Sequence, residues 1–178
     1  ERGQRTIFNF LGPLLNPARP SAQLVGVPRP SLCEPIARVL QSLGLRRGLV
    51  VSGAVTPSSP DASAPHLDEF STLGPNTLAE FYQDRGFATG TLDPAEWPLQ
   101  PARLEDLAGG NREANAATVR QLLAGQDRGP RRDAVLLNAG AALFVAGRAR
   151  SIAEGWDLAE SVIDRGQAAA TLADLAKS

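Results

Sequence analysis

Two short apolar runs with an amphipathic helix pattern between them are the feature that most restricts what this chain can fold into. Residues 22–27 and 48–52 are apolar enough to form buried strands. Between them, Ser31 and Glu34 have the spacing of a helix capping box, and Gly44 is placed to end the helix. A strand, a helix and a strand in this order make a βαβ unit, whose two strands pair in parallel. We therefore expect an α/β domain with a mainly parallel central sheet and flanking helices.

The remainder of the chain adds a loop, a hairpin and a helical C-terminal half. Residues 54–66 contain three prolines and three serines, which predicts an exposed, flexible loop. Residues 77–82 and 87–92 have the character of two strands around a polar turn, which predicts a hairpin added at the sheet edge. Helical periodicity and capping residues predict further helices over residues 111–125, 133–145, 151–164 and 168–176.

Composition excludes several classes of protein. The 178 residues include one cysteine, Cys33, which excludes an internal disulfide and a cysteine-based zinc cage. The one histidine, His66, lies in the loop and is expected to be a solvated surface residue, whereas Cys33 is expected to be core. A net charge of −1 disfavours a nucleic-acid partner, because tight phosphate-backbone binding needs clustered basic residues. The longest apolar run, residues 139–145, is too short to cross a bilayer, so we expect no membrane partner.

Asp68 and Glu69 are the candidate metal ligands. They follow the second strand of the βαβ unit after the loop, and ligands of open α/β sheets bind outside the carboxyl ends of the strands. Adjacent carboxylates there suit Mg²⁺, which prefers oxygen ligands and takes substrate phosphates as further ligands. On spacing alone, a solvated acidic pair on the surface explains the same residues.

Two further features have both a binding interpretation and a structural one. Arg5 precedes an apolar segment and a Gly-Pro turn, where its guanidinium could hold a carboxylate in a bidentate fork; a surface ion pair is the alternative. The run Gly109-Gly110-Asn111 opens a helix, where free backbone N–H groups could receive an anion; an ordinary N-cap at Asn111 is the favoured alternative.

Taken together, several segments resemble the anthranilate phosphoribosyltransferase family. Residues 5–17, R-T-I-F-N-F-L-G-P-L-L-N-P, resemble the signature segment of that family, and residues 23–27, Q-L-V-G-V, continue its pattern. The remaining matches follow in the family's order and span nearly the whole chain: Val50-Val51 before Asp68-Glu69, Gly109-Gly110 before Asn115-Ala116, and Asn138-Ala139-Gly140-Ala141.

This resemblance implies transfer of a 5-phosphoribosyl group from phosphoribosyl pyrophosphate to anthranilate, in tryptophan biosynthesis. It implies that Arg5 holds anthranilate through its carboxylate, and that Asp68 and Glu69 bind the cofactor Mg²⁺ beside the pyrophosphate. The implied fold is a catalytic domain like those of nucleoside phosphorylases and phosphoribosyltransferases. In the family this domain is joined to a small N-terminal helical domain through which the enzymes commonly form homodimers, and the implied location is cytoplasmic.

The chain departs from the family's pattern in three ways. The family has a Gly-rich phosphoribosyl pyrophosphate loop before the segment that matches residues 5–17, and neither this loop nor the helical domain is present in these residues. We therefore expect residues 1–178 to be the C-terminal part of the catalytic domain of a longer protein, and to be inactive alone. The family usually has His-Gly where this chain has Ser52-Gly53, and the loop over residues 54–66 is longer than the family's.

Two other functions are compatible with this fold. A pyrimidine-nucleoside phosphorylase shares the architecture but uses phosphate and a nucleoside, and the segment over residues 5–17 argues against it. A non-catalytic relative that binds nucleic acid on the same fold is the second alternative. The balanced charge argues against that relative, since Arg46-Arg47 and Arg131-Arg132 are short basic spots and not a stripe.

Overall fold

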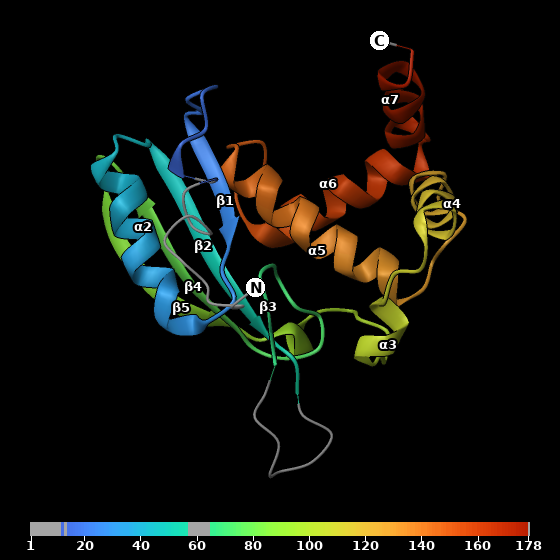
Figure 1. Cartoon of the computed structure of the whole chain (residues 1–178), viewed down its shortest axis with the longest axis horizontal. Coiled ribbons are helices and arrows are strands. Elements are labelled where there is room, and N and C mark those ends of the chain that lie inside the picture. Colours follow the sequence, from blue (N-terminus) through green and yellow to red (C-terminus); the bar gives the residue numbers. More distant parts are fainter. Residues whose placement is uncertain (1–11, 13, 57–64, 178) are drawn as a thin grey trace, which may run out of the picture.

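The computed structural model describes residue 12 and residues 14–56 and 65–177. It shows a five-stranded sheet with helices on both faces. Helix α2 (Cys33–Ser42) covers one face, while α5 (Pro130–Val145) and α6 (Ile152–Asp164) lie on the other (Figure 1). Within the described part of the chain, no helix is both long enough and apolar enough to span a membrane.

The predicted βαβ unit is confirmed. Strand β1 (Ala22–Gly26), helix α2 and strand β2 (Arg47–Ala54) follow one another, and the two strands pair in parallel. The predicted cap of the helix is wrong. Ser31 lies inside a short 3₁₀ turn, η1 (Pro30–Leu32), and α2 begins after Leu32 without a side-chain cap.

The expectation of a mainly parallel sheet is also wrong for the described strands. The strand order is β1-β2-β4-β5, where β4 is Asn76–Tyr82 and β5 is Gly86–Leu92. Only β1 and β2 are parallel; β4 runs antiparallel to β2, and β5 antiparallel to β4. The physical reason is the connection, because parallel neighbours need a crossover element, and no described helix separates β2 from β4. The sheet is therefore mixed.

The hairpin over residues 77–92 is confirmed as β4 and β5, but only β5 forms the edge, because β4 pairs directly with β2. The short strand β3 (His66–Leu67) pairs antiparallel with the end of β2. One edge of β2 pairs with β4 as far as Gly53. Strand β3 therefore pairs with the opposite edge of β2, the edge that also pairs with β1, at a point beyond the end of β1. The two ends of the predicted loop over 54–66 thus belong to strands; residues 57–64 lie outside the described residues.

The C-terminal half is helical, as its periodicity predicts. Asn111 is the N-cap of α4, where its side chain accepts a hydrogen bond from the Ala114 N–H. Ser151 likewise accepts from the Glu154 N–H at the start of α6. The long apolar helix begins at Pro130, three residues before the predicted start, since proline is favoured in the first turn. The other elements are η2 (Pro94–Glu96), α3 (Leu104–Leu107), α4 (Arg112–Leu123) and α7 (Gln167–Leu175).

Two hydrophobic cores lie on the two faces of the sheet, because alternate residues of a strand point to opposite sides. Leu49 and Val51 pack with α5 and α6, while Val50 packs with α2. Helices α5 and α6 approach closely where Gly140 meets Gly155: a Cβ on Gly155 would stand 2.2 Å from the Gly140 carbonyl oxygen. A side chain at this crossing would force the helices apart.

We expect Cys33 to be unreactive in the folded protein. Its side chain is 2% exposed, and burial raises the pKa of its thiol to about 11. Because the thiolate is the reactive form, labelling by a disulfide reagent at pH 8 should be roughly a hundredfold slower than in the urea-unfolded chain. Equal labelling rates in the folded and unfolded chain would contradict the burial of Cys33.

Candidate functional site

The acidic pair Asp68 and Glu69 lies at the carboxyl ends of the two parallel strands. Both residues follow β3, and both are exposed. Their backbone packs against Gly26, the last residue of β1, and against Gly53 near the end of β2. The structure therefore brings this pair to the edge of the sheet where ligands of α/β domains bind.

Gly26 and Gly53 are glycines because the acidic segment passes directly over them. A Cβ on Gly26 would stand 1.5 Å from the carbonyl oxygen of Asp68, and one on Gly53 would stand 2.5 Å from that of Glu69. Neither distance is sterically possible, so only glycine lets the segment lie this close to the strands.

Asn138, in the middle of α5, fixes the backbone immediately after the pair. Its Oδ1 accepts a hydrogen bond of 2.9 Å from the Phe70 N–H, and its Nδ2 donates one of 2.9 Å to the Phe70 carbonyl. The amide thus satisfies both backbone groups of one residue, as a neighbouring strand would. Phe70 itself is 1% exposed and packs in the core between the sheet and α5.

Asn76, at the start of β4, fixes the backbone of Ser71, the residue after Phe70, in the same way. Its Oδ1 accepts from the Ser71 N–H at 2.6 Å, and its Nδ2 donates to the Ser71 carbonyl at 2.9 Å. Both residues are fully buried. Two amides on different elements therefore anchor the chain that carries the carboxylates, which reduces the entropy lost when a ligand binds them.

The sequence did not predict that these two asparagines fix the backbone next to the acidic pair. A signal for Asn138 was present, because an amide in an apolar helix needs hydrogen-bond partners. For Asn76 no local signal existed, since its partners depend on how β4 meets the segment after β3.

The electrostatics of the pair favour a cation. Partial desolvation raises the pKa of Glu69, and the negative charge of Asp68 raises it further, although the residue is exposed by area. Among the described residues, neither carboxylate forms an ion pair or a hydrogen bond. No group of three or more histidine, cysteine or acidic residues able to hold a metal occurs in this part of the chain. The donor set is thus two carboxylates, which suits an ion that keeps waters and phosphates as its other ligands.

The other sequence-predicted candidates do not join this site. Arg5 lies outside the described residues. At the glycine run, the Gly110 N–H donates to the Asn115 side chain and the Ala114 N–H to that of Asn111. These donors are occupied, so the N-cap interpretation is confirmed and the structure gives no support for an anion site there.

Ser52, at the position where the family usually has histidine, is fully buried. Its hydroxyl has no hydrogen-bond partner among the described residues. It follows Val51 and precedes Gly53, which both face α5, so Ser52 faces the opposite side, toward α2. Ser52 therefore does not touch the acidic segment on the α5 side of the sheet.

Comparison with known proteins assigns the class of this domain. The model of a glycosyl transferase family, a/b domain, matches residues 2–169. The chain therefore belongs to this glycosyl transferase family.

Curated relatives show which members of this family the chain resembles in sequence. The chain is 47% identical over 172 residues to anthranilate phosphoribosyltransferase 2 of Streptomyces coelicolor. The matched region covers 97% of this chain and 48% of that protein. It is also 47% identical over 171 residues to the anthranilate phosphoribosyltransferase of Methylorubrum extorquens, covering 96% and 47%. The chain thus spans about half the length of the curated relatives it matches.

Solved structures give the same result. The crystal structure of anthranilate phosphoribosyltransferase from Thermus thermophilus matches with a TM-score of 0.78 and 41% identity, over 97% of this chain and 47% of that one. The enzyme from Saccharomyces cerevisiae, in complex with PRPP and Mg, matches with a TM-score of 0.75 and 25% identity, over 96% and 45%. The mixed sheet and its flanking helices are therefore shared with these transferases.

Proposed function

We propose that this chain is the C-terminal part of the catalytic domain of an anthranilate phosphoribosyltransferase of tryptophan biosynthesis. The complete protein would transfer the 5-phosphoribosyl group of phosphoribosyl pyrophosphate to anthranilate, giving N-(5-phosphoribosyl)anthranilate and pyrophosphate. The observation that carries the proposal is the exposed acidic pair Asp68-Glu69, held over Gly26 and Gly53 at the carboxyl ends of the parallel strands. The identity to anthranilate phosphoribosyltransferases over almost the whole chain supports it.

Asp68 and Glu69 are the residues proposed to hold Mg²⁺. When bound, the ion would supply positive charge against the negative charge that develops on the leaving pyrophosphate. The yeast relative that binds PRPP and Mg supports this choice of ion and substrate. In this chain, Asn138 and Asn76 would act as positioning residues, because they fix the backbone on which the two carboxylates stand.

The chemistry requires few catalytic groups. The amine nitrogen of anthranilate forms a bond to C1′ of the ribose, the bond from C1′ to the pyrophosphate oxygen breaks, and pyrophosphate leaves with that electron pair. The amine then loses one proton. Since an aromatic amine is already a nucleophile, positioning supplies much of the rate enhancement. A chain with one histidine and one cysteine is compatible with this reaction.

Arg5 is the residue proposed to hold anthranilate, through its carboxylate. In the full-length protein, we expect Arg5→Ala to raise the KM for anthranilate by roughly 30- to 150-fold. This corresponds to about 2–3 kcal/mol for the loss of a charge-assisted bidentate contact. The KM for phosphoribosyl pyrophosphate should change much less. Arg5→Lys should restore binding only in part, because an ammonium cannot reproduce the fork. An unchanged KM for anthranilate would refute this role.

The experiment that tests the function compares two reactions of the full-length protein. We expect pyrophosphate release that depends on both anthranilate and phosphoribosyl pyrophosphate. Cleavage of a pyrimidine nucleoside by phosphate, without transferase activity, would instead identify a phosphorylase. Salt-dependent retention of DNA or RNA with neither activity would identify the non-catalytic relative.

Three further properties belong to the same proposal. The 178-residue chain assayed alone should be inactive, because the Gly-rich loop of the family is not among its residues. The complete protein should be a homodimer that assembles through the helical domain, with a cytoplasmic location. Sedimentation of the full-length protein tests its oligomeric state.

A further inference from the structure

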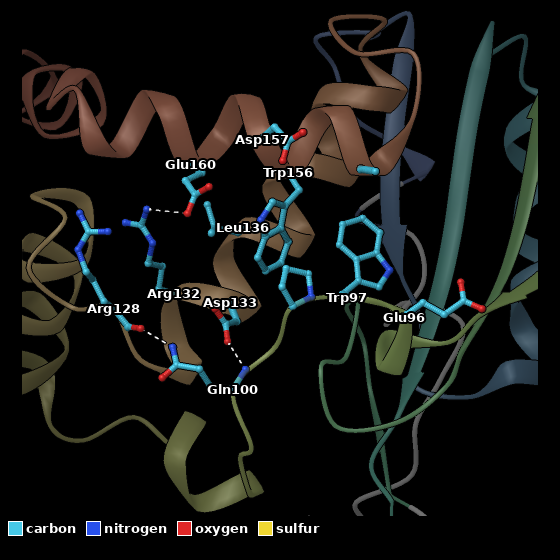
Figure 2. A pocket seen from close by; sticks show the side chains of 12 residues that line it. Glu96, Trp97, Gln100, Arg128, Arg132, Asp133, Leu136, Trp156, Asp157 and Glu160 are labelled. Atoms are coloured by element: carbon cyan, nitrogen blue, oxygen red, sulfur yellow. Dashed lines mark hydrogen bonds and ion pairs between the residues drawn. The ribbon is translucent and has the colours of Figure 1, made fainter.

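A cavity lies between α5, α6 and the segment that follows η2 (Figure 2). Its volume is about 590 Å³, which is large enough for a small molecule. Neither Asp68 nor Glu69 lines it, so it is separate from the candidate metal site.

Both tryptophans of the chain, Trp97 and Trp156, line this cavity. Their ring centroids are 5.4 Å apart and the ring planes are inclined by 51°. Figure 2 shows the two rings next to each other, Trp97 from the segment after η2 and Trp156 from α6. The face of an indole ring attracts cations, more strongly than those of tyrosine or phenylalanine.

The charges around the cavity leave an excess of carboxylates. Arg132 is 3% exposed, and its Nη2 lies 2.8 Å from Asp164 Oδ1 and 3.4 Å from Glu160 Oε1. The Nη2 of Arg128 also lies 3.1 Å from Asp164 Oδ1. Both arginines of the cavity therefore have acidic partners through Nη2, while the buried Nη1 of Arg132 has no hydrogen-bond partner among the described residues.

Two other carboxylates of the lining, those of Asp133 and Asp157, form no ion pair within the described residues. The Glu96 carboxylate points away from the cavity in Figure 2. This excess of negative charge on the lining disfavours an anionic ligand. The field of the cavity instead favours a positively charged one.

Asp133 is the carboxylate whose environment most needs a cation. It is 6% exposed, and its Oδ2 accepts a hydrogen bond of 2.8 Å from the Gln100 N–H. Its other oxygen, Oδ1, has no hydrogen-bond partner among the described residues. Burial raises the pKa of this carboxyl, with smaller opposing effects from the Gln100 N–H and the Arg132 charge. A buried carboxylate with one free oxygen on a cavity wall is stabilised by a cation in that cavity.

We propose that this cavity binds a small organic cation, a substituted ammonium, between the tryptophan rings and the carboxylates of Asp133 and Asp157. The aromatic faces distinguish such a ligand from a bare metal ion, which would need clustered oxygen donors, and no such cluster occurs in the described part of the chain. In the view of Figure 2, the Trp156 ring lies between these two carboxylates.

The two tryptophans make the proposal directly testable, because the indole N–H signals of the chain in an NMR spectrum both report on this cavity. The probe is tetramethylammonium chloride, titrated against sodium chloride at equal ionic strength. We expect saturable shifts of both indole signals with tetramethylammonium and no saturable shift with sodium.

The variants Asp157→Asn and Asp133→Asn should each weaken tetramethylammonium binding about fivefold, the effect of removing one carboxylate at a partly solvated site. Asp157 is exposed, so its replacement leaves the fold intact. The amide oxygen introduced by Asp133→Asn would still accept from the Gln100 N–H.

The matched control is Asp174→Asn, which removes an exposed carboxylate of α7 that pairs only with Lys177 among the described residues. Binding in the control should equal that of the wild type. Absence of saturable shifts in the wild type, or equal binding by all variants, would overturn the proposal.

Discussion

Replacing Asp68 by Asn and Glu69 by Gln together is expected to reduce transferase activity of the full-length protein by roughly a hundredfold or more, because the stabilisation of a leaving group by a metal ion is worth several kcal/mol. The remaining activity should no longer increase with Mg²⁺ concentration. Each single variant should lower the activity less and raise the Mg²⁺ concentration needed for half-maximal rate. The measurement is the initial rate of pyrophosphate release as a function of Mg²⁺ concentration.

The same variants should leave folding stability almost unchanged, since both carboxylates are exposed and unpaired within the described residues. Urea unfolding of wild type and variant checks this. Glu105→Gln is the matched control, because it removes an exposed carboxylate on α3 outside the candidate site. Wild-type Mg²⁺ dependence in the double variant would show that the pair is only a solvated part of the surface.

Replacing Gly26 by Ala should disturb both the fold and the site. The added Cβ would stand 1.5 Å from the Asp68 carbonyl oxygen and 2.2 Å from its carbonyl carbon. Backbone must therefore move, although Asn138 and Asn76 hold the following residues in place. We expect a loss of about 1–3 kcal/mol in the free energy of unfolding, measured by urea denaturation. In the full-length protein, the half-maximal Mg²⁺ concentration should rise as well.

Gly90→Ala is the matched control for this substitution. Gly90 is also a strand residue, but a Cβ there would meet only Leu78 Cδ1, at an ordinary contact distance of 3.7 Å. Its effect on stability should stay within about 0.5 kcal/mol. If Gly26→Ala were as harmless as Gly90→Ala, the acidic segment could not lie against the end of β1.

Elements whose signals are local were predictable from the sequence. The first βαβ unit follows from apolar runs and helical spacing, and the cap at Asn111 depends on a residue three positions away. The hairpin over β4 and β5 is equally local, because its turn lies between the paired residues. The cap predicted at Ser31 failed because the chain forms a 3₁₀ turn there, and α2 begins only after that turn.

Arrangements that depend on distant parts of the chain were decided only by the tertiary structure. The sequence placed Asp68 and Glu69 after a strand, but their position over Gly26 and Gly53 depends on which side of β2 receives β3. In the same way, nothing local indicates that Asn138 contacts Phe70, or that Trp97 and Trp156 share a cavity.

The antiparallel place of β4 beside β2 is the clearest case. Hydrophobic pattern specifies that a strand is buried, and the connection then limits its direction, but the choice of neighbour depends on the summed packing of both faces of the sheet. The sequence alone therefore determined the elements and the chemical character of the acidic pair. The packing of α5 and β4 against the residues after β3 determined where that pair stands, because only long-range contacts fix the backbone that carries it.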